Sequence, residues 1–337
     1  MTHYRTFSWT DPNVWQDDIN DGDAVTVRGN DAAALDMLVA DLITSQLGER
    51  WYSDGLAAWP EQTARDALQL RLMLIERCRK PKNVSFESEA LAKKLAACRP
   101  EYRCGSGACP ECQRAVQNLL VNAMSRYFSV RGKKLDVVSL VPPEQIMRPG
   151  NDALKAWLTA GNRMRRALMA AKVGPAVGAL DISANEHVAG HFQPHYKPHL
   201  WVFLRAGMLN RGTAARERLR EFLPRGNGVF NPVKRMPWNG GLNAMAYVCK
   251  NVPTRRISGM SSGNALRAPH KKTRIRSPLS HQHVEIALIL DEVGFGRRLF
   301  LRYIEVTSSD GRLTFRPRSV AGSTDGGGGS LIGNPGE

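Results

Sequence analysis

"HVAGHFQPHYKPHLWVFLRA", residues 187–206, places a histidine at every fourth position before it becomes an apolar run. A four-residue period is typical of one face of a helix. Pro194 and Pro198 exclude a helix here, because proline lacks the amide N–H and clashes with the preceding helical turn. We therefore expect the segment to run extended into a strand, beside a second strand at "AVGALDIS" (176–183).

Patterns of helix and strand continue on both sides of this pair of strands. The predicted helices are 31–50, 61–79, 86–97, 114–130, 151–172, 212–223, 241–252 and 282–293, and the remaining predicted strands are 135–141, 297–306 and 311–317. This order predicts an α+β fold, in which an antiparallel sheet carries helices on one face and is preceded by a helical region and a four-cysteine zinc site.

Four regions follow one another along the chain in this interpretation. Residues 1–97 are mainly helical, and residues 98–128 hold a cysteine cluster and the helix after it. Residues 129–320 form the sheet domain with its basic segments, and the glycine-rich end, 321–337, is expected to be a disordered tail.

The chain of 337 residues is strongly basic, with 47 Lys and Arg against 31 Asp and Glu, a net charge of +16. Two dense basic runs, 211–235 and 254–276, predict a face that binds a polyanion, with nucleic acid as the first candidate. A basic surface that is merely solvated is the alternative. The residues expected on a DNA-binding face are Arg255, Arg256, Lys271, Lys272, Arg274 and Arg276. No signal-peptide core and no membrane-length apolar run occurs, so we expect a cytoplasmic protein that does not bind membranes.

Four of the six cysteines lie within "CRPEYRCGSGACPEC", as Cys98, Cys104, Cys109 and Cys112. Zinc takes four thiolates in a tetrahedron, and a Cys-x-x-Cys pair on a tight turn supplies two of them without strain. A redox disulfide and ordinary core cysteines are the competing interpretations. We expect structural zinc, because disulfides are rare in a cytoplasmic chain. Four cysteine ligands leave zinc no open position, so this site is not catalytic.

The strand that begins in the histidine-rich segment also suggests a second metal site. His195 and His199 lie on one face of an extended strand, and Asp181 on the neighbouring strand is expected to face the same way. Two imidazoles and a carboxylate are suitable ligands for a divalent cation. The alternative is a set of surface or hydrogen-bonded histidines that hold no metal.

A tyrosine and a lysine follow on one predicted helix, in "AMAYVCKNVP" (244–253). Tyr247 and Lys250 are three residues apart and so share a helical face. A tyrosine hydroxyl beside a cation and a divalent metal can attack a phosphodiester and become covalently attached to it. Most tyrosines on such helices are instead core residues with a solvated hydroxyl.

Taken in order, "CGSGACPECQR", "GALDIS", "KPHLWVFL" and "YVCK" make residues 98–305 resemble the rolling-circle replication initiators of plasmids and phages. These proteins belong to the His-hydrophobe-His endonuclease superfamily. The resemblance implies a single-strand DNA nickase and ligase that forms a 5′-phosphotyrosine and leaves a free 3′-OH. It implies Tyr247 as the nucleophile, Lys250 as its helper and His199 as a ligand of Mg²⁺ or Mn²⁺. It also implies origin DNA, host helicase and host polymerase as partners.

This chain departs from the family where a second histidine is expected, because it reads His199, Leu200, Trp201. Either His195 substitutes from the same face, with Asp181 or Glu186 completing the site, or the protein binds DNA without cutting it. A related single-tyrosine transposase is a further alternative. An RNA-binding protein is disfavoured, because the strands carry no aromatic pattern of the kind that stacks RNA bases.

Overall fold

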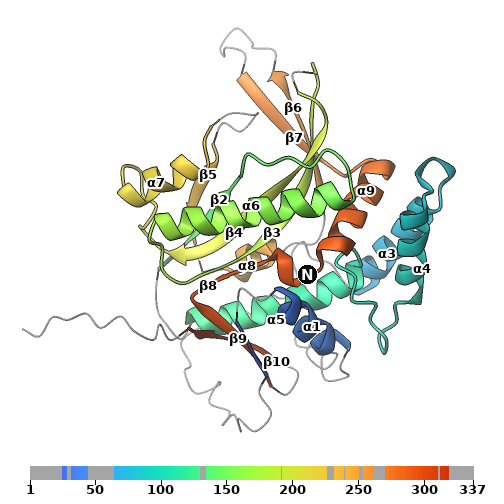
Figure 1. The fold of residues 1–337 in the computed structure, drawn as a ribbon, viewed down its shortest axis with the longest axis horizontal. Coiled ribbons are helices and arrows are strands. Elements are labelled where there is room, and N and C mark those ends of the chain that lie inside the picture. The colour runs from blue at the N-terminus through green and yellow to red at the C-terminus, as the bar shows by residue number, and fades with distance from the viewer. Residues whose placement is uncertain are drawn as a thin grey trace, which may run out of the picture.

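The computed structural model describes ten stretches of the chain (Figure 1): residues 25–28, 32–44, 64–129, 134–190, 192–225, 231–238, 240–249, 253–261, 270–309 and 312–318. Their helices are α1 (Ala32–Thr44), α3 (Ala64–Cys78), α4 (Phe86–Ala97), α5 (Pro110–Ser129), α6 (Asn151–Ala170), α7 (Ala214–Phe222), α8 (Leu242–Val248) and α9 (Ser280–Val293), with 3-10 turns η3 (Pro81–Asn83) and η4 (Gly296–Arg298). Their strands are β1 (Val25–Arg28), β2 (Leu135–Leu140), β3 (Ala176–His187), β4 (His195–Arg205), β5 (Val233–Pro237), β6 (Thr254–Ser261), β7 (His270–Arg276), β8 (Leu299–Arg302), β9 (Ile304–Ser309) and β10 (Arg312–Pro317).

The main sheet has seven strands, in the order β5-β2-β4-β3-β6-β7, with β8 also paired to β3. Every pair in it is antiparallel except β3 with β6, which is parallel. The α+β class and the mostly antiparallel sheet are therefore confirmed. The histidine-rich segment forms the start of β4, and its register with β3 places Asp181 directly opposite His199.

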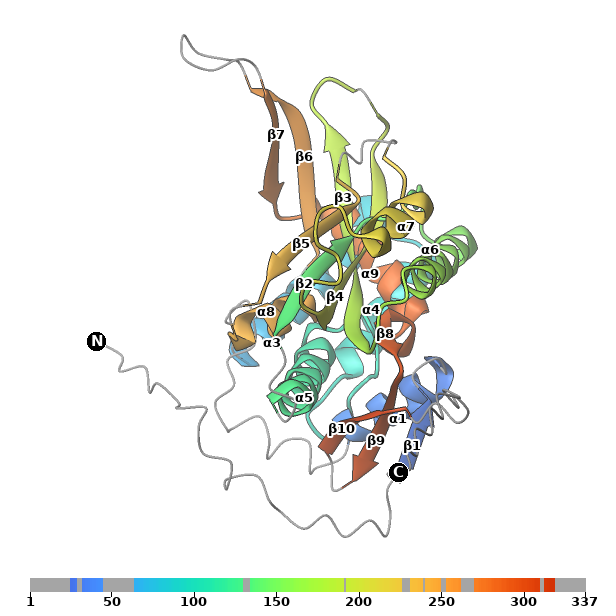
Figure 2. The ribbon, with the colours of Figure 1, turned by 90° about the vertical axis from the view of Figure 1, so that its left-hand side faces the viewer.

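The two faces of this sheet are covered by different helices (Figure 2). Tyr196 on β4 donates a hydrogen bond from its hydroxyl to Glu285 of α9, so the even-numbered β4 residues face α9. The odd-numbered residue Trp201 packs against Tyr247 of α8. Helices on one face were expected, and the structure instead has α8 on the face opposite α9. The reason is that the second face also carries large apolar side chains that must be covered, such as Phe203, whose ring lies 5.8 Å from that of Phe128 in α5.

Helix α6 supplies much of the apolar core on the α9 side of the sheet (Figure 1). Trp157, Met164 and Leu168 recur at helical spacing along it and are fully buried. The indole nitrogen of Trp157 donates a hydrogen bond to the carbonyl oxygen of Arg297, 3.2 Å away. This helix therefore attaches the segment at η4 to the sheet.

Strands β5, β6 and β7 were not expected from the sequence, which reads there as basic and glycine-containing runs. They lie at the two edges of the sheet, and Ile275 on β7 is 63% exposed. When neither face of a strand is well buried, its sequence has no clear alternation of apolar and polar residues. The sequence pattern therefore does not predict such a strand.

A second, three-stranded sheet joins distant parts of the chain, in the order β1-β9-β10 (Figure 2). The predicted terminal hairpin is formed by β9 and β10, whereas β8 crosses to the main sheet. Tyr127 of α5 packs edge-on against Phe315 of β10, with their ring centroids 6.4 Å apart. Helix α5 thus links the small sheet to the main one.

Candidate functional site

The cysteine cluster brings together all four predicted ligands. Cys98 follows α4, Cys104 lies in the next loop, and Cys109 and Cys112 lie at the start of α5. Their four sulfur atoms all lie within 4.8 Å of one another. Separations of 3.7–3.8 Å join Cys98 to Cys109 and Cys112, and Cys104 to Cys112. With Zn–S bonds of about 2.3 Å, a tetrahedral site has sulfur–sulfur edges of about 3.8 Å. The cluster can therefore hold a metal such as zinc.

Polar contacts hold the loop around these sulfurs in place and couple the four thiols to one another. The Arg71 guanidinium donates to the carbonyl oxygen of Cys98 at 3.0 Å and forms an ion pair with Glu111 of α5. Hydrogen bonds among the thiols lower the pKa of Cys98 and raise the pKa of Cys109 and Cys112 above that of a free cysteine. Gly107 lets the loop approach α9 closely, because a Cβ there would overlap the carbonyl oxygen of Leu290.

A second polar cluster lies on the α8 side of the main sheet, which we call the site face. It is the face that carries Asp181, Ser183, His195, Lys197 and His199. Asp181 and His199 form a cross-strand pair, and Ser183 Oγ lies 3.2 Å from His199 Nε2. The predicted proximity of Asp181 and His199 follows directly from this register, and both side chains are buried.

His195 lies on the same face but not next to His199. Four residues of extended strand separate their Cα atoms by about 13 Å. The ring nitrogen Nδ1 of His195 lies 2.9 Å from the carbonyl oxygen of Gln193, which orients the imidazole. Burial lowers the pKa of His195. Within the described stretches, the cysteine cluster is the one group of three or more His, Cys, Asp or Glu ligand atoms that gathers tightly enough for a metal. A site for Mg²⁺ or Mn²⁺ formed by Asp181, His195 and His199 stays a prediction.

Lys197 lies between the two histidines, and sequence reasoning missed it. Lys197 is 3% exposed, and its ammonium makes no hydrogen bond to any residue that the structure describes. Burial lowers the pKa of Lys197 to about 8, although the negative charge of Glu144 opposes this shift. A lysine in a strand normally reads as a solvated residue, so the sequence offered no signal for a buried one.

Tyr247 reaches the site face from α8. Its ring packs edge-on against Trp201, with the ring centroids 5.0 Å apart, and Trp201 follows His199 on the same face of β4. Tyr196, one residue after His195 on β4, points to the opposite face and bonds Glu285, as the alternation of an extended strand predicts. Lys250, the predicted helper of Tyr247, lies outside the described residues.

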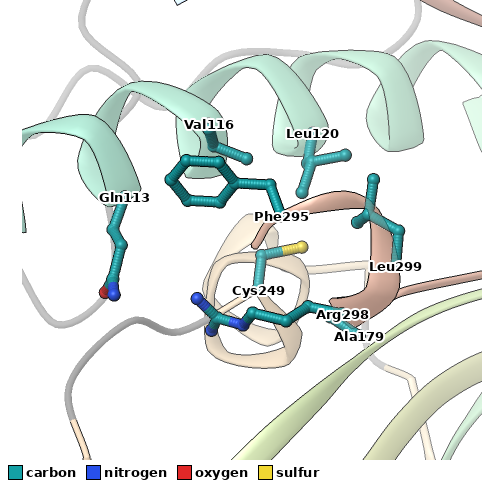
Figure 3. A pocket seen from close by; sticks show the side chains of 8 residues that line it. All are labelled: Gln113, Val116, Leu120, Ala179, Cys249, Phe295, Arg298 and Leu299. Atoms are coloured by element: carbon teal, nitrogen blue, oxygen red, sulfur yellow. The ribbon is translucent and has the colours of Figure 1, made fainter. Parts of the chain in front are cut away.

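Arg298 is a further buried cation on this side of the sheet, contributed by η4. It is 8% exposed, and its Nε donates to the carbonyl oxygen of Leu180 at 3.5 Å. Burial lowers the pKa of its guanidinium, and the charge of Asp181 opposes that shift. Figure 3 shows Arg298 beside Cys249 and pointing toward Gln113 in a cavity of about 20 Å³, which has room for about one water molecule.

The residues predicted to bind DNA divide between the two faces of the β6-β7 hairpin. Arg255 faces α9 and forms a bidentate ion pair with Glu186, which lowers the pKa of that carboxyl. Arg256, one residue on, is paired with Asn185 and so lies on the site face. Arg274 and Arg276 are exposed on β7. Lys271 and Lys272 belong to β7, but their side chains lie outside the described residues.

Comparison with protein-family models, with curated proteins and with solved structures found no match to this chain. None of the helices in the described part of the chain combines the length and the apolarity that crossing a membrane requires.

Proposed function

We propose that this protein nicks and rejoins single-stranded DNA through a covalent phosphotyrosine at Tyr247, as an initiator of rolling-circle replication of a plasmid or phage-like element. The single observation that carries the proposal is the packing of Tyr247 on Trp201, beside the Asp181–His199 pair. A nucleophile, an imidazole and a carboxylate then lie on one face of one sheet. Buried cations on the same side favour a phosphodiester as the group that binds there.

The reaction needs only one exchange of bonds at phosphorus. The Tyr247 oxygen bonds to the phosphorus, the P–O3′ bond breaks, and the electron pair leaves with the 3′ oxygen. The proton lost by tyrosine is balanced by one gained at the 3′-OH, and the reverse reaction joins the strands. In this proposal His199 and Asp181 would accept or hold that proton. Asp181 and His199 would also be two ligands for Mg²⁺ or Mn²⁺, whose charge would stabilise the phosphate.

The zinc site is the second part of the proposal. A zinc ion held by Cys98, Cys104, Cys109 and Cys112 would stabilise the connection between α4 and α5, because α5 packs on α8 through the bond from Gln117 to the carbonyl oxygen of Ala246. The ion would thereby support the helix that carries Tyr247 without contacting DNA.

A binding protein without nuclease activity is the rival, and the absence of a second histidine at Trp201 favours it. A related single-tyrosine transposase shares the chemistry of the main proposal. Covalent attachment to DNA separates the enzymes from the binding protein.

The test is an adduct assay on Tyr247. Wild-type protein is incubated with single-stranded and supercoiled DNA, with and without Mn²⁺, and protein–DNA adducts that survive SDS are detected on gels. We expect Tyr247→Phe to lose the adduct completely while its DNA affinity changes less than twofold, because only the nucleophilic oxygen is removed.

Tyr196→Phe is the matched control. It removes a tyrosine hydroxyl on the opposite face of the sheet, where Tyr196 of β4 bonds Glu285 of α9, so this variant should still form the adduct. Mass spectrometry that finds the DNA on any tyrosine other than Tyr247 would overturn the assignment. A wild-type chain that binds DNA and never forms an adduct would leave the binding protein as the function.

A further inference from the structure

Four buried hydrogen-bond donors on the site face have no partner among the described residues. One, Nε1 of Trp201, lies beside Tyr247, and the other three are Nζ of Lys197, Oγ1 of Thr254 and Nε of Arg256. Buried donors in proteins are almost always paired. Three unpaired donors in one region therefore require an explanation.

The strand register places Lys197, Thr254 and Arg256 on adjacent strands, on either side of Ser183 and Asn185 of β3. Lys197 on β4 is opposite Ser183 on β3, and Ser183 is paired in turn with Thr254 on β6. One step along the same face, Asn185 is paired with Arg256. Strands lie about 4.8 Å apart, so Lys197 and Thr254 are roughly 10 Å apart at the backbone, a gap that a lysine side chain and a phosphate can span.

Within the part of the chain that the structure describes, the buried charge of Lys197 has no hydrogen-bonded anion. Glu144 is the anion that acts electrostatically on Lys197, but its carboxylate forms its ion pair with Arg163 of α6. Removing an ammonium from water without an anion or hydrogen-bond acceptor is strongly unfavourable. The burial of the Lys197 ammonium becomes favourable when an anion from outside the protein binds to it.

We propose that Lys197, Thr254 and Arg256 form a subsite for a backbone phosphate of the strand that Tyr247 attacks. This inference rests on the proposed function for the identity of the strand. Ser183 and Asn185 lie between these donors on β3, and Asn185 Nδ2 donates to the carbonyl oxygen of Ser183 at 2.9 Å and to its Oγ at 3.1 Å. The three donors can each bond an oxygen of a phosphodiester.

The experiment measures binding of a fluorescently labelled single-stranded oligonucleotide over a range of salt concentrations. We expect Lys197→Met to weaken binding about tenfold or more, as loss of a charge-assisted hydrogen bond predicts. The slope of log affinity against log salt should fall by about 0.7, the value for one neutralised phosphate on single-stranded DNA. Lys155→Met, which removes an exposed lysine of α6, is the matched control and should match wild type in both measurements.

Thermal unfolding distinguishes a binding role from a structural one. Lys197→Met removes an unpaired buried charge, so its melting temperature without DNA should equal or exceed that of wild type. If Lys197→Met instead melts well below wild type, Thr254→Val decides, because it removes only one unpaired hydroxyl. Weaker binding by Thr254→Val then supports the subsite, and unchanged binding overturns it.

Adduct formation is measured in parallel, so that the two proposals fail in different ways. If the wild-type protein binds DNA but forms no adduct, the nicking proposal is overturned. The effect of Lys197→Met on binding then still tests the phosphate subsite. An adduct with Lys197→Met binding like wild type overturns the subsite alone. No binding of single-stranded DNA by wild type overturns both.

Discussion

Trp201 occupies the position at which the family that the sequence resembles carries a metal-binding histidine. An indole has no lone pair with which to coordinate a metal, but the edge-on contact of Trp201 with the Tyr247 ring restricts where that ring can lie. Trp201 therefore makes a packing contact at the position where the resemblance predicts a ligand. Asp181 lies directly across the strand pair from His199.

His283 supports a prediction on pH at the scale of one residue. Its side chain is 8% exposed, and Arg77 donates to its Nδ1 at 2.6 Å, so burial and the arginine charge lower its pKa to about 4. The unfolded chain, with a histidine pKa near 6.5, binds the proton more readily. The stabilisation is therefore fully present above pH 6.5 and is lost as pH falls toward 4.

We expect the free energy of unfolding to fall by on the order of 2 kcal/mol between pH 7 and pH 5 through this residue. His283→Gln, which keeps an acceptor for Arg77, should lose correspondingly less over the same range in urea unfolding at each pH. Equal pH dependence of the variant and wild type would show that His283 takes up its proton in the folded state.

At the scale of elements, the loop between α4 and α5 has almost no secondary structure of its own. Its conformation depends on the four sulfurs, on Arg71 and on the close approach of Gly107 to α9. An element of this kind is stable only while its cross-links are in place.

We therefore predict one zinc per chain, measured by elemental analysis after gel filtration. Cys109→Ser should lose the metal and lower the melting temperature by several degrees, because the ion contributes folding free energy directly. Cys249→Ala is the control, since Cys249 is a buried thiol outside the cluster that lies 3.8 Å from the sulfur of Met124. A metal-free wild type that is fully folded would contradict the prediction.

At the scale of the whole molecule, the excess of positive charge is not spread evenly. Arg274 and Arg276 project from the exposed edge strand β7, while Arg255 is neutralised by Glu186. The site face adds buried cations from β4 and η4, and β6 adds Arg256, which is half-buried. Arg274 is paired with Ile257 and Arg276 with Arg255, so both lie on the α9 face of the hairpin and not on the site face. We interpret this edge of the β6-β7 hairpin as a basic surface that attracts DNA to the molecule.

The prediction that follows is that Arg274→Glu with Arg276→Glu weakens binding of single-stranded DNA at least tenfold in low salt. The salt slope should fall by about 0.7 for each phosphate that the variant no longer neutralises, because fewer counterions are released. Arg65→Glu with Lys93→Glu makes the same change in net charge on α3 and α4 and should have little effect. If both double variants weaken binding equally, net charge alone attracts DNA and the hairpin has no special role.

What the sequence determined by itself was local. Two prolines excluded a helix before β4, apolar periodicity predicted the helices from α3 to α6 and α9, and a cysteine spacing of a few residues predicted the metal cluster. Each of these signals arises within about 20 residues, where backbone geometry and side-chain pattern act directly. The strand pattern correctly put His195 and His199 on one face, but it did not bring them together, because four residues of extended strand separate them.

The tertiary structure alone decided which distant residues meet. Tyr247 reaches Trp201 across 46 positions of sequence through the placement of α8, and Thr254 and Arg256 join Lys197 through the parallel pairing of β6 with β3. Arg298 comes to Asp181 from the turn before β8. Strand pairing and helix docking depend on contacts between segments that are far apart in the chain. The burial of a charged residue such as Lys197 follows from those contacts, and the residues next to it in the sequence do not predict it.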